Sequence, residues 1–519
     1  MIRRAGSVAD VVCDGLFVIL TAIGVVRSLT HAMWRDELEV FMLAQGHASL
    51  FELFRALDYT GHPGLWPTLV WLIVQATADP VWMQVAHTVL AVAASVIVYR
   101  WAPFSKAEKV LLLAGYVLFF EYFVISRSYV LLVLIGFGFL ALRQYRPDQR
   151  LVPWLLLGLL ANTHLLGAIW SIALGAMLAI EQARRAPVLL AGGAAYLGLL
   201  ALAVITMTPA PDFGPWGNEF AFDLSRLGSR LSYAVGPFVP LSSDAVKSTF
   251  AFLASPDSAA APKFWNVNAV GDVVALSGTN TEHPLRLALV FAAPVAVCWL
   301  VARVPLAVLQ FVLAYVGIVA FATIWDFAGD ARHQGVVFLA FIAAVWTARA
   351  QRPPTVVSSA LFVSLLAINA FAGVLTLASV SQPFSRSRDA AAWIRQSNLA
   401  DAFLIGSRDA QVSSVSGYLG RPIYYLECEC RGTFVVWNTK RNSMISDAEF
   451  WRRLAVAVDA AGQAEAILIR YRPIAAGELV SNPAGVSIIP LGGFTGAVTD
   501  ENYWIYRLST AAMSQTIGK

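Results

Sequence analysis

Long apolar runs recur through the first 380 residues, and they constrain the fold more than any other feature of the sequence. A helix of about 20 apolar residues crosses the hydrocarbon core of a bilayer and satisfies its own backbone hydrogen bonds there. The sequence therefore predicts a polytopic α-helical membrane protein with about eleven transmembrane helices. They lie near residues 12–30, 81–99, 109–126, 128–142, 151–164, 165–181, 187–207, 285–302, 304–325, 334–348 and 355–380.

Composition supports this class. Hydrophobic residues make up 58% of the chain, charged residues only 13%, and the mean hydropathy is +0.64. Such a chain has too little polar surface for an ordinary soluble protein. The net charge of +4 is spread over many short loops, so it offers no argument for nucleic-acid binding.

The positive charges predict the topology. A further apolar run, residues 64–78, is short and contains Pro67, so we expect it to lie in the membrane interface. Thirteen cations then fall on one side of the membrane and five on the other, and cations in short loops stay cytoplasmic. This predicts a cytoplasmic N-terminus and an outer C-terminus in a bacterial inner membrane. The thirteen are Arg3, Arg4, Arg100, Lys106, Lys109, Arg143, Arg146, Arg150, Arg184, Arg185, Arg303, Arg349 and Arg352, and the five are Arg27, Arg35, Arg55, Arg127 and Arg332.

Two regions follow from the change in composition at residue 382. Residues 1–381 form the membrane module, with juxtamembrane helices in an outer loop at 31–80. A second outer loop at 209–284 is interpreted as a lid or acceptor-binding loop, with a linker as the alternative. Residues 382–519 are predicted to form a soluble extracytoplasmic α/β domain without a nucleotide-binding motif. Its expected strands are 402–405, 422–426, 433–437, 466–471, 486–491 and 503–508, and its expected helices are 387–397, 409–419 and 447–461.

Ionisable residues from distant motifs fall at the outer ends of the predicted helices or in the outer loops. Such residues are costly at a membrane edge, so their convergence on one face indicates a functional site. They are Asp36, Glu37, His62, Arg127, His164, Asp326, Asp330, Arg332 and His333.

These residues suit the transfer of a group from a lipid phosphate to a hydroxyl. Asp36, beside Glu37, is predicted to accept the proton of the hydroxyl. A leaving phosphate needs cations or fixed donors, and a guanidinium binds it in a bidentate manner. The predicted phosphate-binding set is Arg127, Arg332, His333, His62 and His164, and Glu121, Tyr129 and Arg35 are supporting candidates.

Each assignment has a structural alternative. The acidic pair could cap the short helix 37–45, and the two arginines could be interfacial anchors. His62 could serve a turn, and His164 could satisfy a helix kink. No metal ligands are assigned, although a divalent metal is compatible with this set.

The four cysteines divide into two pairs. Cys13 and Cys298 lie in apolar spans and are interpreted as core residues. Cys428 and Cys430 form a C-x-C pair that is too sparse for a zinc site without partners. A structural role is the favoured interpretation for this pair, with a disulfide or a metal contact as alternatives.

Several motifs together resemble the GT-C superfamily of membrane glycosyltransferases, with protein O-mannosyltransferases and lipid A aminoarabinose transferases as the nearest comparison. The resemblance rests on Asp36-Glu37 in the first outer loop, the amphipathic segment 41–46, and His62-Pro63-Gly64-Leu65 before apolar sequence. These motifs span about the first 170 residues, and the architecture resembles the family over the whole chain. The family usually has His-Pro-Pro or Lys-Pro at the last motif, which places this chain outside the best-known branches.

The resemblance implies a polyprenyl-phosphate sugar as donor, with no other cofactor required. It also implies inverting transfer to a glycan, lipid or protein hydroxyl on the outer face, and Asp36 as the base. The Arg332-His333 pair resembles the late-helix Arg-Tyr of many relatives. The main rival is a transporter or flippase of a lipid-linked saccharide, but the helix interiors are nearly free of ionisable residues. Transfer of phosphoethanolamine or an acyl group would need a nucleophile with a metal cluster or a His-Asp pair, and neither is evident.

Overall fold

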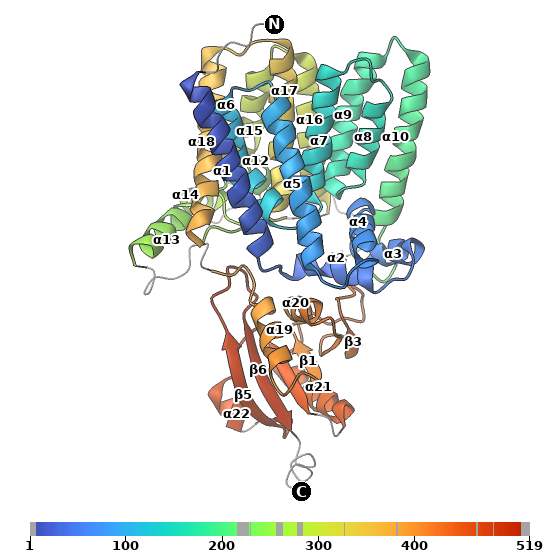
Figure 1. The fold of residues 1–519 in the computed structure, drawn as a ribbon, viewed down its shortest axis with the longest axis vertical. Coiled ribbons are helices and arrows are strands. Elements are labelled where there is room, and N and C mark those ends of the chain that lie inside the picture. Colours follow the sequence, from blue (N-terminus) through green and yellow to red (C-terminus); the bar gives the residue numbers. More distant parts are fainter. Residues whose placement is uncertain are drawn as a thin grey trace.

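The structure of the protein is a computed structural model. It describes residues 7–214, 228, 230–255, 263–277, 284–325, 327, 329–379, 382–462, 465–480 and 482–509. A bundle of helices carries the first part of the chain, and a sheet domain lies against one end of that bundle (Figure 1). Asp326 lies outside the described residues, as does part of the segment 209–284.

The helices of the membrane module run in the following order. They are α1 (Val8–Thr30), α2 (Arg35–Gln45), α3 (Leu50–Ala56), η1 (Leu57–Tyr59), α4 (Leu65–Val74), α5 (Val81–Trp101), α6 (Lys106–Ala114), the π-helix η2 (Val117–Val124), α7 (Tyr129–Tyr145), α8 (Val152–Ala161), α9 (Leu165–Gln182), α10 (Ala186–Met207), α12 (Leu231–Val235), α13 (Ser243–Ala254), α14 (Val270–Ser277), α15 (Pro284–Val301), α16 (Pro305–Ile324), α17 (Ala331–Gln351), α18 (Val356–Leu375) and η3 (Thr376–Ser379).

Within the described ranges, seven helices are long and apolar enough to cross a membrane, namely α1, α5, α9, α10, α16, α17 and α18. The pair η2 and α7, bent by 120°, is an eighth candidate if it counts as one span. Several helices of a length to cross a bilayer indicate a multi-pass membrane protein. The expected count of about eleven is not confirmed, because α6 has 9 residues and α8 has 10.

The segment between α1 and α5, predicted to be the first outer loop, folds into short helices beneath the bundle (Figure 1). The interfacial run expected at residues 64–78 forms α4, which has only 10 residues and packs against α2. Trp66 and Val70 on α4 are buried. At the start of α2 the Glu37 side chain accepts a hydrogen bond from the Trp34 backbone N–H, which fixes the first helical turn. Asp36 lies in that turn.

The described residues of the C-terminal domain form a six-stranded sheet in the order β3-β2-β1-β4-β6-β5. Strand β1 is parallel to both β2 and β4, whereas the β2–β3, β4–β6 and β5–β6 pairs are antiparallel. The elements are α19 (Ser387–Gln396), β1 (Phe403–Ser407), α20 (Asp409–Leu419), β2 (Ile423–Tyr425), β3 (Cys430–Gly432), α21 (Asp447–Ala461), β4 (Ala466–Arg470), α22 (Ala476–Val480), β5 (Ser487–Phe494) and β6 (Tyr503–Ser509).

The α/β order and the three expected helices agree with this sheet, but one predicted strand is wrong. Residues 433–437 are not a strand, and β3 comes earlier, at Cys430–Gly432. The segment instead turns toward the membrane module, where the Trp437 carbonyl accepts a hydrogen bond from the Gly214 N–H at 3.0 Å. Its β-like composition reflects tertiary contacts rather than pairing in the sheet. Cys428 and Cys430 form a disulfide, whereas Cys13 and Cys298 are free thiols.

Hydrogen bonds hold the domain against the start of α2. The Arg35 backbone N–H donates to Glu501 Oε1 at 2.8 Å, and Arg35 Nη1 lies 2.6 Å from Asp500 Oδ1. The Met33 N–H donates to the Tyr418 hydroxyl at 2.8 Å. The chain that leads into α2 is therefore fixed by both parts of the protein, which positions Asp36.

Candidate active site

The Asp36 carboxylate is held between two arginines from distant parts of the chain. Its Oδ2 atom lies 2.9 Å from Nη2 of Arg332 and 3.1 Å from Nη1 of Arg127. The same Arg127 nitrogen donates to the Asp36 backbone carbonyl at 2.6 Å, and Arg332 Nη1 pairs with Asp330 Oδ2 at 2.6 Å. Within the described residues, Asp36 Oδ1 accepts no hydrogen bond, and Arg35 Nε is 3.9 Å away. One carboxylate oxygen, Oδ2, thus binds both guanidinium groups, whereas Oδ1 is available to accept a hydrogen bond.

Glu37 organises the segment that carries Arg127. This carboxylate is fully buried, and its Oε1 accepts a hydrogen bond from the Ser126 N–H at 2.6 Å. Its Oε2 lies 2.8 Å from Nε2 of His31. Ser126 and Arg127 belong to the link where the chain bends sharply between η2 and α7. Glu37 therefore joins this link to α2 and is not brought to the open side of Asp36.

Three histidines extend the site from Arg127 toward α17. The ring centroids of His62 and His164 are 5.8 Å apart, and those of His164 and His333 are 5.7 Å apart. His164 Nδ1 accepts from the Leu166 N–H, and His333 Nδ1 accepts from the Asp330 N–H. These two bonds assign the remaining hydrogen of each neutral ring to Nε2.

His62 and His164, which lie outside the helices, are neutral at neutral pH. Burial, with the nearby Arg127 charge, lowers the pKa of His62 to about 3. Burial likewise lowers the pKa of His164 well below its ordinary value. At neutral pH these rings therefore contribute fixed hydrogen-bonding groups to the site, and the two arginines supply its positive charge.

The supporting candidates lie around this network rather than in its centre. The Tyr129 hydroxyl is 3.2 Å from His164 Nε2, and Glu121 accepts from the Tyr116 hydroxyl at 2.6 Å. Arg35 faces the C-terminal domain. Arg332 Nε and Glu121 Oε2 are buried without a hydrogen-bond partner in the described part of the chain. A buried donor without a partner is costly, so Arg332 keeps binding capacity for a further acceptor.

A cavity of about 550 Å³ opens beside these residues and has two chemically different ends. Its apolar wall is a feature that motif analysis missed, because single Leu, Val and Phe residues in a span carry no distinguishing signal. The wall comes from α9, α10, α16 and the segment after α16, and α9 packs against both α10 and α16. The polar end contains Asp36, Glu39, His62, Arg127, His164, Arg332 and His333, and the apolar wall contains Leu165, Ile169, Val204, Met207, Phe321, Trp325 and Phe327.

Two carboxylates that line the cavity differ in charge. Burial tends to raise the pKa of Asp36, but Arg332 and Arg127 outweigh it and hold the pKa below its ordinary value. Burial, together with the Asp36 charge, raises the pKa of Glu39 to about 7. At neutral pH Asp36 is therefore ionised, whereas Glu39 titrates near neutrality.

A second cavity, of about 500 Å³, is lined by Gly214 and by residues of the C-terminal domain, and two printed contacts connect its lining to that of the first cavity. Trp437 lines this second cavity, and its Nε1 donates to Glu39 Oε1 at 3.0 Å. Phe213, which lines the first cavity, forms an isolated β-bridge with Asn438, which lines the second. The second cavity lies at the carboxyl end of β1. The parallel strands β2 and β4 flank β1 on opposite sides, so the strand order changes direction at this point. Open α/β sheets commonly bind ligands at such a point.

Within the described residues, no group of three or more histidine, cysteine or acidic side chains is arranged to hold a metal ion. No family model, curated protein or solved structure matches the chain.

Proposed function

We propose that the protein is a membrane glycosyltransferase that moves a sugar from a polyprenyl-phosphate donor to a hydroxyl acceptor. The observation that carries this proposal is the pairing of an ionised Asp36 and two arginines with a long apolar wall in one cavity. A lipid phosphate has the same two parts, an anion and an apolar chain. The arginines match the anion, and the wall between α9, α10 and α16 matches the first prenyl units.

The chemistry follows from the positions of the charges. The acceptor oxygen forms a bond to the anomeric carbon as the carbon–oxygen bond to phosphate breaks. The phosphate leaves with the electron pair and is stabilised by Arg127 and Arg332. The acceptor proton passes to Asp36 through the open Oδ1 atom. A single displacement of this kind inverts the anomeric configuration.

The second cavity is the proposed approach for the acceptor. Its lining offers the hydrogen-bond donors and acceptors that a hydroxyl-rich molecule needs. Among the described residues, Trp437 and the Phe213–Asn438 bridge connect this lining to that of the donor cavity. This arrangement would bring the acceptor to the Asp36 side of the donor while the lipid remains among the helices.

Deletion of the gene tests the function, and it separates a transferase from a flippase. We expect mass spectrometry of cell-envelope glycans from the deletion strain to show loss of one sugar, with its lipid-linked donor accumulating on the outer leaflet. A flippase defect would remove the same sugar but leave the donor on the inner leaflet. Donor accumulation inside, or unchanged glycans, would contradict the proposal.

The proposed topology has eleven crossings, a cytoplasmic N-terminus and an extracytoplasmic sheet domain. The cation distribution supports it, and so does the Cys428–Cys430 disulfide, because disulfides persist outside the cytoplasm. Single cysteines at Gln149 and Ser443, in a background with Cys13 and Cys298 replaced by serine, should label from opposite sides. In intact cells an impermeant maleimide should reach position 443 only. Labelling of both positions would refute the topology.

Glu39 should make donor binding dependent on pH. A group with a pKa of about 7 becomes ionised as the pH rises from 6 to 8, and its charge then repels the donor phosphate. We expect the affinity for a polyprenyl-phosphate sugar to fall by roughly three- to tenfold over this interval. A phosphodiester does not titrate in this range. Glu39→Gln keeps an acceptor for Trp437 and should make the affinity independent of pH, so an unchanged pH dependence in this variant would exclude Glu39.

A further inference from the structure

A third cavity, of about 260 Å³, lies at the end of the helical module opposite the C-terminal domain. It is formed where α15 meets α16 and where α17 meets α18. Arg332 lies in the first turn of α17 at the candidate active site, whereas Arg349 and Arg352 lie at the other end of this helix. A helix of 21 residues is about 30 Å long, which is the thickness of the hydrocarbon core. The third cavity therefore lies at the level of the lipid headgroups of the other leaflet.

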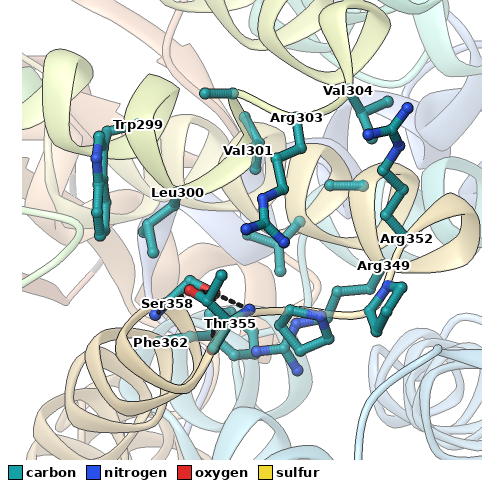
Figure 2. A pocket seen from close by; sticks show the side chains of 15 residues that line it. Trp299, Leu300, Val301, Arg303, Val304, Arg349, Arg352, Thr355, Ser358 and Phe362 are labelled. Carbon is teal, nitrogen blue, oxygen red and sulfur yellow. Dashed lines mark hydrogen bonds between the residues drawn. The ribbon is translucent and has the colours of Figure 1, made fainter.

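Three arginines from two helix junctions face this cavity, and they are not equivalent. Arg349 pairs with Glu108 at 2.7 Å and lies over the rings of Phe104 and Phe362, so its charge is already neutralised. Arg303 and Arg352 are exposed and form no ion pair with any residue that the structure describes. Figure 2 shows the Arg303 side chain extending into the space above Thr355 and Ser358. The cavity thus holds two positive charges without a counter-ion.

The remaining walls suit a lipid rather than a soluble anion. Trp299 lines the cavity, and 56% of it is exposed on the perimeter of the helix bundle. Tryptophan side chains are enriched at membrane–water interfaces. Val356 and Val357 do not line the cavity, but they lie between Thr355 and Ser358, which do, and they are 87% and 63% exposed. Apolar side chains with this exposure, beside unpaired arginines, provide contacts for both the acyl chains and the phosphate of one molecule. Basic pockets between transmembrane helices bind anionic headgroups.

We propose that this cavity binds the headgroup phosphate of an anionic phospholipid through Arg303 and Arg352. Figure 2 shows the Arg352 side chain extending toward Val304, away from the Arg303 guanidinium group. Binding therefore requires Arg352 to reorient so that both guanidinium groups contact the phosphate oxygens, while Trp299 contacts the glycerol region and the acyl chains lie along α15 and α18. The site is independent of the transfer reaction, since it lies at the opposite end of α17.

Native mass spectrometry of the full-length protein, delipidated in detergent and titrated with phosphatidylglycerol, tests the site. Each arginine near the surface should strengthen binding roughly fivefold, so the double variant Arg303→Ala/Arg352→Ala should bind on the order of 25-fold more weakly. Arg184→Ala/Arg185→Ala is the matched control, because it removes two exposed arginines from the turn between α9 and α10 at the same end of the module. The control should bind phosphatidylglycerol like the wild type. The double lysine variant should retain part of the affinity.

Two further titrations identify the ligand. Phosphatidylcholine, which carries no net charge, should bind much more weakly than phosphatidylglycerol. Inorganic phosphate should not displace the bound lipid at equal concentration. The lipid-free melting temperatures of all variants should agree, since both arginines are exposed. The proposal is overturned if the double alanine variant loses no more affinity than the control, if phosphatidylcholine binds equally well, or if inorganic phosphate competes on equal terms.

Discussion

Replacement of Asp36 by asparagine is expected to lower turnover by about 10² to 10⁴, while expression and donor binding persist. Asparagine keeps the size of the side chain and much of its hydrogen bonding to the two arginines, but it cannot accept the acceptor proton. Turnover of the purified variant, measured with a saturating donor, checks this. Activity within a factor of about three of the wild type would move the role to another carboxylate, and Glu39 is the other one that lines the cavity.

Asp330→Asn is the matched control for that variant. Asp330 also pairs with Arg332, at 2.6 Å, but it does not line the cavity. The substitution removes a carboxylate charge from the same guanidinium without removing the proposed base. Its turnover should stay within about tenfold of the wild type. An equal loss in both variants would show that Asp36 acts by pairing with the Arg332 guanidinium group and not by accepting a proton.

Replacement of Arg332 by alanine is expected to weaken binding of a short-chain polyprenyl phosphate by about 1.5 to 3 kcal/mol, the range for hydrogen bonds to charged groups. Arg332→Lys should restore only part of the affinity, because an ammonium cannot reproduce the planar fork. Since Arg127 and Arg332 converge on one point, the double alanine variant should lose less than the sum of the single losses. Calorimetry of these three variants and of Arg127→Ala measures the affinities.

Arg143→Ala provides the control for these affinities. Arg143 also binds a carboxylate, that of Glu181, in a bidentate manner. It lies at the end of α7 away from the cavity. Its loss should leave donor affinity unchanged. If both single variants at Arg127 and Arg332 bind the lipid phosphate like the wild type, the two arginines only hold Asp36 and the anion site is elsewhere.

The sequence predicts at which ends of the helices the candidate site residues lie, but it does not predict how their side chains meet. Apolar spans and loop charges place Asp36, Arg127 and Arg332 at one membrane face, because hydropathy reports where each helix ends. The direction in which each side chain points depends on helix packing, which hydropathy does not contain. The direct contact of both arginines with Asp36 Oδ2 therefore appears only in the structure.

Contacts that join distant segments were the hardest to predict. Glu39 carries no motif, and its partner Trp437 lies 398 residues away in a segment that was predicted to be a strand. Likewise the apolar run 109–126 predicts one span, whereas the chain forms two separate helices there, α6 and the π-helix η2. Local patterns predicted α20 and α21 with the observed bounds, because each helix has an aspartate in its first turn and a glycine directly after its last residue, and both are local signals.

The most direct test of the account is transfer by the purified protein. The full-length chain would be reconstituted in vesicles with a polyprenyl-phosphate sugar labelled in the sugar, together with membranes of the deletion strain as the source of acceptor. We expect free polyprenyl phosphate and a labelled product of inverted anomeric configuration, both formed about 10² to 10⁴ times more slowly with Asp36→Asn. Movement of intact donor across the vesicle membrane without cleavage of the sugar–phosphate bond would contradict it.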